Sequence, residues 1–300
     1  CISRVEFIST VSRFIAEGVK KLYPEAERKL HVVYAGADTE KFKPAWSPEG
    51  IANKNRLKKK YNLEKYKIVL FVGRLSVKKG VHVLLKAMQK VMETHTDVAL
   101  VLVGSKWYGG NRTDEYVRSV TDISKSLPGP VVMTGFLPPD EIPAYYNMAD
   151  IFVCPSQWNE PLARVHYEAM AAGLPIITTN RGGNPEVIIG EGNGLVLNEY
   201  ANPDAMADYI EYLLGKPHLI DEMGRKGYAL AMEKYNWKRV AEDLLKLFAR
   251  VEEKIGRKSP SPTDKKEKKK TDGVKVDSID YSMLTETYRN YLKKWHNRYY

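Results

Sequence analysis

Two glutamates, Glu160 and Glu168, stand eight positions apart in a segment of mostly apolar and small residues. Pro161 suits the first position of a helix, because its missing N–H would have no intrahelical partner there. In a helix that starts here, Glu168 would lie ~12 Å further along the axis than Glu160, with an angular offset of about 80°. Both carboxylates could then border one cleft and contact the two ends of an elongated polyhydroxylated ligand.

The start of this predicted helix would leave three backbone N–H groups free, those of Leu162, Ala163 and Arg164. Together with the helix dipole they form a small positive pole, which favours phosphate or hydroxyl oxygens. We therefore expect this turn, Pro161 included, to bind substrate. A plainer alternative for the glutamates is an acidic group at a helix N-terminus and a solvated helix face. The apolar neighbours of Glu168 argue against the solvated face.

Two cations follow an apolar, strand-like run at residues 68–73. Arg74 comes directly after the run, and Lys79 is expected to begin the next helix. Both are placed to meet a diphosphate, the arginine through its bidentate fork and the lysine as a point charge. Taken alone, the pattern is also typical of an ordinary surface, and Lys78 is an adjacent candidate for the same role.

Residues 156–187, SQWNEPLARVHYEAMAAGLPIITTNRGGNPEV, resemble the donor-site motif of retaining glycosyltransferases with the GT-B fold. These enzymes form family four, the glycosyl transferases group 1. The resemblance extends through VVYAGADTEKFKP (32–44) and GRLSVKKG (73–80) and covers about residues 1–250. Within the family, the wording is most similar to the spore coat protein SA type of Bacillus-like bacteria.

The resemblance implies a role for each charged residue. Arg74 and Lys79, the latter in the family's place directly before Gly80, would hold the pyrophosphate of a nucleotide sugar. Glu160 would face the transferred sugar, and Glu168 would accept hydrogen bonds from the ribose hydroxyls. Departure of the nucleoside diphosphate builds negative charge, so fixed cations stabilise the transition state more than the ground state. Arg74, Lys79 and Glu160 are therefore the predicted catalytic residues.

Two loops complete the predicted site. The resemblance places Gly182 and Gly183 beside the phosphates and the sugar, since glycine lets backbone amides approach a ligand closely. A plain turn is the alternative for that loop. The resemblance also gives Gly135, Phe136 and Leu137, which follow another strand-like run, to the pocket for the base.

The sequence indicates no metal or cofactor. His31, His82 and His95 have no metal-ligand spacing, and the chain contains no Asp-x-Asp. This agrees with GT-B enzymes that need no divalent cation. His166, inside the motif, has no matching role in the family and is predicted to be structural. We expect no nucleophile from the protein, because in the family departure and attack take place on the same face of the sugar.

The elements that must position these residues alternate along the chain. Strand-length apolar runs at 31–36, 68–73, 98–104, 131–135, 151–155, 175–179 and 194–197 are separated by helical patterns. Near-continuous Val, Ile and Leu in such runs indicates a parallel sheet covered on both faces. We predict an α/β fold, a Rossmann-like doubly wound sheet that forms the C-terminal domain of a GT-B enzyme, with a C-terminal helical extension.

We predict that the chain has four parts. The resemblance implies that residues 1–29 are the remnant of an N-terminal acceptor domain, most of which would be missing. Residues 30–255 would form the nucleotide-sugar-binding domain. A basic linker, 256–280, is predicted to be disordered. An aromatic stripe at helical spacing predicts an amphipathic helix at 281–300, which would dock on its own domain, bind a partner or anchor to a surface.

The overall composition is that of an ordinary globular protein, with 43% hydrophobic and 28% charged residues. Of the net charge of +10, +6 lies in residues 256–300, so nothing marks the folded part as a binder of nucleic acid. No apolar run approaches the ~20 residues of a membrane span, which leaves only peripheral membrane contact. The two cysteines, Cys1 and Cys154, favour a reducing cytoplasm, with incorporation into a spore coat as an extension.

The expected function is transfer of a hexose from a nucleoside-diphosphate sugar to an unidentified glycan, lipid or protein acceptor, in synthesis of a cell-surface or spore-coat glycan. A nucleotide-sugar-binding or coat protein without turnover is the alternative, because a cleft lacking its acceptor domain would admit water. Another GT-B chemistry, sugar-nucleotide epimerisation, is a further alternative. The epimerase would isomerise the donor without any acceptor.

Overall fold

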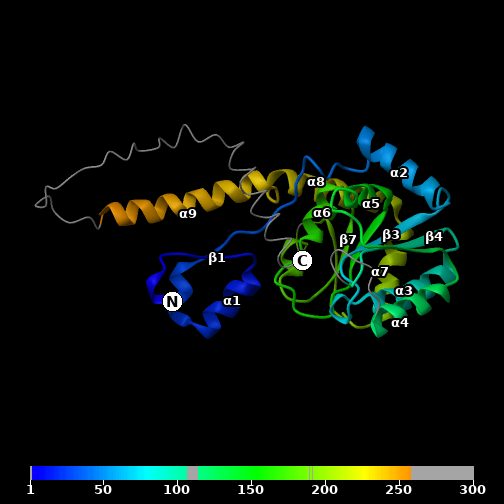
Figure 1. Cartoon of the computed structure of the whole chain (residues 1–300), viewed down its shortest axis with the longest axis horizontal. Coiled ribbons are helices and arrows are strands. Elements are labelled where there is room, and N and C mark those ends of the chain that lie inside the picture. The colour runs from blue at the N-terminus through cyan, green and yellow to red at the C-terminus, as the bar shows by residue number, and fades with distance from the viewer. Residues whose placement is uncertain (1, 107–113, 189, 191, 258–300) are drawn as a thin grey trace, which may run out of the picture.

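A six-stranded parallel sheet with helices on both faces forms the body of the protein (Figure 1). The computed structural model describes residues 2–106, 114–188, 190 and 192–257. The strand order is β5-β4-β3-β6-β7-β8. The bounds of these strands are β3 Lys67–Val72, β4 Val98–Val103, β5 Val131–Gly135, β6 Ile151–Cys154, β7 Ile176–Thr179 and β8 Gly194–Leu197. The predicted doubly wound α/β fold is confirmed.

Side chains of each central strand point alternately into two hydrophobic cores. In β3, Ile68 and Leu70 face one core, while Val69 and Phe71 face the other. Helices α2 (Pro48–Lys60), α5 (Ile142–Met148), α6 (Val165–Ala171) and α8 (Pro217–Glu233) contribute to the first core. Helices α3 (Val81–Thr94), α4 (Glu115–Lys125) and α7 (Pro203–Leu214) contribute to the second. Burial on both faces explains why the strands are apolar without a polar alternation.

Side-chain caps define where several helices begin. Ser47, Asp114 and Asn202 each accept a hydrogen bond from a backbone N–H in the first turn of α2, α4 and α7. Such caps satisfy N–H groups that have no partner within the helix. These caps fix the first residues of the three helices at Pro48, Glu115 and Pro203.

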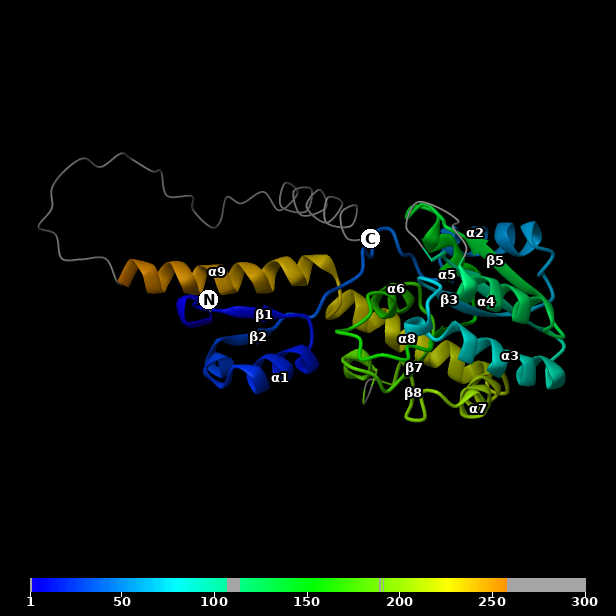
Figure 2. The same ribbon diagram turned by 60° about the horizontal axis from the view of Figure 1, so that its bottom comes forward.

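The N-terminal residues form a small unit of their own beside the large sheet (Figure 2). Strands β1 (Ile8–Thr10) and β2 (Leu30–Val32) pair in parallel and are joined by α1 (Arg13–Leu22) and a 3-10 segment, Pro24–Lys29. The prediction that residues 31–36 add a strand to the large sheet is therefore wrong. Their β-pairing partner is β1, a strand of the short N-terminal segment.

Helix α9 (Trp237–Arg257) leaves the large sheet and runs back along β1, as both views show (Figures 1 and 2). Its first turn is tied to the chain that follows β2, because Arg239 donates to the carbonyl oxygens of Tyr34 and Ala35 at 2.6 and 3.1 Å. The backbone N–H of Ala37 donates to the carbonyl of Tyr235 at 2.9 Å. The last described helix thus holds the N-terminal unit in place.

Glu186 provides a second tie between the N-terminal unit and the large sheet. Its carboxylate accepts hydrogen bonds from the backbone N–H groups of Arg13 and Phe14 and from the hydroxyl of Tyr34, each at 2.8 Å. The two amides belong to the first turn of α1, where a negative charge also complements the helix dipole. Loop 180–186, which follows β7, is therefore joined directly to the N-terminal segment.

Of the segment predicted as a linker and a C-terminal helix, 256–300, the structure describes only the first two residues. Helix α9 continues to Arg257, two residues into the segment predicted as a linker. The rest of the predicted linker and the predicted helix at 281–300 lie outside the described residues. The four-part division of the chain stays a prediction. Within the described ranges, no helix is long and apolar enough to cross a lipid bilayer.

Candidate functional site

A cleft of about 770 Å³ lies at the carboxyl ends of the central strands. Along the chain, the sheet grows from β3 through β4 to β5 in one direction and from β6 through β7 to β8 in the other. Strands β3 and β6 are neighbours, so the strand order reverses between them. Ligands of open α/β sheets bind at such a switch point. Arg74 follows β3 and Glu160 follows β6, which brings residues far apart in the sequence to one place.

Most of the predicted site residues line this cleft. They come from the loops after β3, β5 and β6 and from the start of α6, and they are Arg74, Lys79, Phe136, Leu137, Glu160, Pro161, Leu162, Ala163, Arg164 and Glu168. Gly135, Gly182 and Gly183 are not among the lining residues. Gly135 ends β5 and accepts a hydrogen bond from the N–H of Gly104 at 3.1 Å. The two basic and two acidic side chains thus border one cavity, as the sequence predicted.

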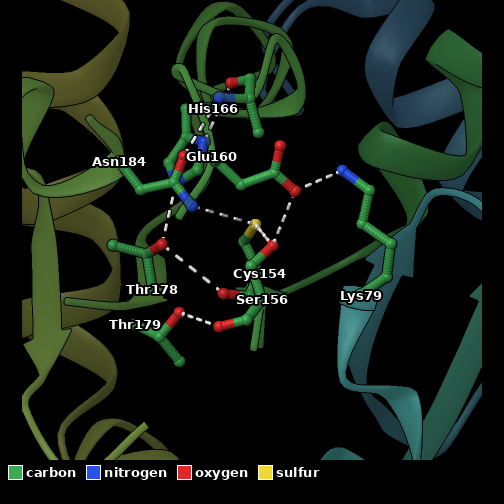
Figure 3. Close-up of polar contacts among 9 residues, drawn as sticks. Lys79, Cys154, Ser156, Glu160, His166, Thr178, Thr179 and Asn184 are labelled. Carbon is green, nitrogen blue, oxygen red and sulfur yellow. Dashed lines mark hydrogen bonds and ion pairs between the residues drawn. The ribbon is translucent and has the colours of Figure 1, made fainter. Parts of the chain in front are cut away.

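Lys79 and Glu160 form an ion pair inside the cleft (Figure 3). Lys79 Nζ lies 2.5 Å from Glu160 Oε1, and the hydroxyl of Ser156 donates to the same oxygen at 3.1 Å. The Glu160 residue is only 5% exposed, and the Lys79 side chain 20%. A buried carboxylate requires such a partner, because an unpaired charge is costly away from water. A diphosphate entering the cleft would meet a lysine that is already oriented.

The sequence predicted that Lys79 begins a helix, and this prediction is wrong. It ends a single 3-10 turn, Val77–Lys79, and Gly80 follows in the left-handed conformation at φ 74° before α3 starts at Val81. A Cβ on Gly80 would lie 1.8 Å from the carbonyl oxygen of Pro155. This close approach of two loops, one after β3 and one after β6, is what brings Lys79 within reach of Glu160.

Gly182 and Gly183 pack against the backbone of the loop that carries Glu160. The N–H of Gly183 donates to the carbonyl oxygen of Glu160 at 2.8 Å. Gly182 has φ 62°, and a Cβ built on it would lie 2.0 Å from the same carbonyl oxygen. Only glycine therefore allows this loop to pack against the Glu160 backbone.

The helix after Glu160 begins later than the sequence predicted. Helix α6 starts at Val165, and residues 160–164 form an irregular loop. The expectation that Pro161 occupies the first helical position is wrong, and so is the ~12 Å axial offset that depended on it. The N–H of Ala163 is not free, because it donates to the side-chain oxygen of Asn184 at 3.0 Å. Contacts with the loop after β7 shape this segment.

Glu168 lies on α6 with its carboxylate half-buried at the cleft. Its Oε2 accepts a hydrogen bond from the hydroxyl of Tyr146, a residue of α5, at 2.9 Å. The two predicted acidic residues therefore differ in their surroundings. The Glu160 carboxylate is paired with a lysine, whereas the Glu168 carboxylate is held by a neutral phenol.

His166 is fully buried and serves as a structural link. Its Nδ1 lies 2.9 Å from the carbonyl oxygen of Ala163, and its Nε2 lies 2.9 Å from the hydroxyl of Thr178 (Figure 3). A neutral ring with its proton on Nδ1 donates to the first and accepts from the second. Burial lowers the pKa of His166 to about 4, so the ring is uncharged at neutral pH. It ties the loop after Glu160 to β7.

His166 is expected to make the fold less stable in weak acid. Its pKa is about 4 in the folded chain, below the ordinary value of 6.5, so the unfolded chain binds the extra proton first. The neutral ring makes its full contribution to the free energy of unfolding above pH 6.5. As the pH falls from 6.5 towards 4, the free energy of unfolding decreases by about 3 kcal/mol. Urea unfolding at several pH values would measure this. A His166→Asn variant should show a flatter pH dependence over that window, and an unchanged slope would contradict the assignment.

Several cleft residues escaped the sequence analysis. From the N-terminal segment and α9 come Val11, Val33, Trp237, Val240 and Leu244, which form an apolar wall. No local pattern links these positions to the glutamate motif, since only the return of α9 brings them together. Trp158 was within reach of sequence reasoning, because it lies inside the motif. It lines the cleft, and its buried indole N–H has no partner among the described residues.

No metal site is evident in the part of the chain that the structure describes. It contains no group of three or more His, Cys, Asp or Glu residues that could hold a metal ion. The positive charge lining the cleft comes instead from Arg74, Lys79 and Arg164. Independence from metals remains a prediction.

The comparisons with known proteins agree with this geometry. Residues 53–230 match the family model described as glycosyl transferases group 1. The chain is 44% identical over 248 residues to spore coat protein SA of Bacillus subtilis, and 43% identical over 222 residues to YtcC of the same strain. These alignments cover 83% and 74% of this chain. They bear out the resemblance stated from the motif.

The chain spans 66% of the length of spore coat protein SA and 54% of that of YtcC. Among solved structures, Anabaena Alr3699/HepE in complex with UDP and glucose superposes with a TM-score of 0.68 at 21% identity. That match covers 82% of this chain and 63% of the other. At this identity the likeness concerns the fold.

Proposed function

The chain belongs to the glycosyl transferases group 1 family, and from this premise we propose that it is the donor-binding part of a retaining hexosyltransferase. The substrate would be a nucleoside-diphosphate sugar. The observation that carries the proposal is the convergence of Arg74, Lys79, Glu160 and Glu168 on one cleft at the switch point of the sheet. The two cations suit the charged diphosphate of such a molecule, and the two carboxylates suit the hydroxyl groups of its sugar and its ribose.

The proposed chemistry is breakage of the bond between the anomeric carbon and the diphosphate, with the electron pair leaving on the phosphate oxygen. Arg74 and Lys79 would neutralise the charge that develops there. Glu160 would accept hydrogen bonds from sugar hydroxyls and stabilise positive charge at the anomeric carbon. The acceptor oxygen would attack from the same face and pass its proton to the departing diphosphate. This scheme requires no nucleophile from the protein and no metal.

Lys79 has two partners in this scheme. In the structure it is paired with Glu160, and this ion pair keeps both side chains in position. Its three donors allow it to contact a phosphate oxygen while it remains near the carboxylate. As the diphosphate gains charge, the balance of the lysine's interactions shifts towards the leaving group, and the transition state is stabilised more than the ground state.

UDP and UDP-glucose are the first candidates for the nucleotide and donor. The Anabaena protein, which shares the fold, was crystallised with UDP and with UDP-glucose. The identity to spore coat protein SA supports a role in the glycan of a spore coat or cell surface. We propose that the acceptor is a glycan, lipid or protein of that surface and that the chain works in the cytoplasm.

A second candidate is a binding protein without turnover. Such a protein would hold the nucleotide sugar in the same cleft, so binding alone does not separate the two candidates.

The decisive experiment combines binding with turnover. Calorimetric titration with UDP, ADP and GDP should give saturable binding of at least one nucleotide. Incubation with the matching sugar donors should then release nucleoside diphosphate, with a full-length glycosyltransferase of the family whose transfer activity has been measured as the positive control. Binding without release favours the binding protein, and an isomerised donor without any acceptor would indicate an epimerase. Absence of all nucleotide binding would refute the donor-site assignment.

A further inference from the structure

We propose that Tyr146 is a positioning residue that holds the Glu168 carboxylate ready for the hydroxyls of a ribose, and that it thereby makes the site selective for ribonucleotides over 2′-deoxyribonucleotides. The inference rests on the proposed function. It concerns a residue of α5 that lies 22 positions before Glu168 in the sequence. Tyr146 does not line the cleft itself, so any effect on a ligand must pass through Glu168.

The contact between the two residues is direct. The hydroxyl of Tyr146 donates to Glu168 Oε2 at 2.9 Å, and Tyr146 is fully buried. A hydrogen bond from a buried donor to a charged acceptor is among the stronger ones in a protein. It selects one rotamer of a side chain that would otherwise be free to turn in a half-buried position.

The ring of Tyr146 is itself immobilised by aromatic neighbours. Phe42 contacts it edge-on, with centroids 5.6 Å apart, and Phe152 of β6 packs against it at the same centroid distance. Because the Tyr146 ring packs against both phenylalanine rings, its hydroxyl has little freedom to move. The position of the carboxylate is therefore set by the core of the domain and not by the flexible chain of the glutamate.

The direction of the hydrogen bond leaves Glu168 its capacity as an acceptor. Burial and the neighbouring carboxylate raise the pKa of Tyr146 well above its ordinary value, so the phenol keeps its proton and donates. An ionised carboxylate has about four acceptor positions on its two oxygens. The tyrosine occupies one on Oε2. Oε1 accepts no hydrogen bond from the described residues, and a vicinal diol such as that of ribose would present two donors to this carboxylate.

The test compares two ligands and two variants that each lose one hydroxyl. Tyr146→Phe removes the donor to Glu168. Tyr145→Phe is the matched control on the same helix, because Tyr145 is also buried and, among the described residues, its hydroxyl bonds only to that of Tyr61, at 2.7 Å. Dissociation constants are measured for UDP and for 2′-deoxy-UDP. If ADP or GDP binds the wild-type chain more tightly, the ribo and 2′-deoxy forms of that nucleotide are used.

We expect Tyr146→Phe to weaken UDP binding about tenfold, while 2′-deoxy-UDP changes by less than about twofold. Tyr145→Phe should leave both constants unchanged. In a double variant, Tyr146→Phe should have no further effect once Glu168→Gln is present, because the two residues act as one unit. Equal losses for both nucleotides, or additive effects in the double variant, would overturn the positioning role.

Two further controls separate a loss of positioning by Tyr146 from a folding defect and from failure of the proposed function. Thermal unfolding shows whether Tyr146→Phe is folded. If it is not, Phe42→Leu loosens the ring but keeps both the phenol and the carboxylate, and it should lower the preference for UDP in the same direction. If the wild-type chain binds no nucleotide, the proposed function fails together with this inference. Binding without any preference between UDP and 2′-deoxy-UDP overturns this inference alone.

Discussion

A Lys79→Met variant is expected to transfer or release sugar ~10²–10³-fold more slowly than the wild-type chain and to bind a nucleoside diphosphate at least about tenfold more weakly. Methionine keeps the unbranched shape and removes the charge. The carboxylate of Glu160, a residue only 5% exposed, then keeps Ser156 as its one hydrogen-bond donor among the described side chains, so the free energy of unfolding should fall by about 3 kcal/mol. Nucleotide titration, diphosphate release and urea unfolding measure the three effects.

The neighbouring lysine supplies the control. Lys78→Met makes the same chemical change one residue away, where the side chain is exposed and its Nζ lies 4.9 Å from the centroid of the Trp158 ring. It should leave affinity and release within about twofold of the wild-type values, because an exposed cation–π contact contributes ~0.5–1 kcal/mol. Similar losses in both variants would mean that the general charge of the loop, and not the Lys79–Glu160 pair, governs the site.

A Gly182→Ala variant is expected to lose about 3 kcal/mol of stability together with donor binding. The added Cβ would lie 2.0 Å from the carbonyl oxygen and 2.6 Å from the backbone nitrogen of Glu160. Backbone cannot give way as a flexible side chain can, so the loop that carries Glu160 must move away from Lys79. Urea unfolding gives the stability, and titration with the preferred nucleotide gives the affinity.

Gly190 separates backbone strain from this collision. Its φ of 77° is as unfavourable for alanine as the 62° of Gly182, but apart from its chain neighbours no described residue has an atom within 4 Å of a Cβ built on it. Gly190→Ala should therefore cost only ~1 kcal/mol and leave nucleotide affinity unchanged. If the two variants lose the same stability, the packing of Gly182 against Glu160 is not what requires a glycine there.

The sequence alone determined the sheet and the place of the site. Runs such as 68–73, 98–104 and 151–155 are apolar throughout because both faces of these strands are covered, and this property of the strand itself is visible in the sequence. Residues that follow such strands must emerge at one edge of a parallel sheet. The meeting of Arg74 with Glu160 at one cleft was therefore predictable without knowledge of any distance.

Only the tertiary structure decided how the site is held. The loop after Glu160 stays irregular up to Val165, although Pro161 favours an earlier helix, because Asn184 and Gly183 bond to its backbone from another loop. Helix and turn preferences amount to fractions of a kcal/mol to about 1 kcal/mol, and contacts of this kind outweigh them.

Tertiary contacts also decided which side chains bond to the two glutamates and how the N-terminal unit is arranged. Tyr146 of α5 donates to Glu168 of α6, and β2 pairs with β1 in an N-terminal unit that Glu186 and α9 tie to the rest of the protein. A sequence pattern records which face of a residue's own element is apolar. It does not record which distant side chain completes a hydrogen bond, since that depends on the packing of the whole domain.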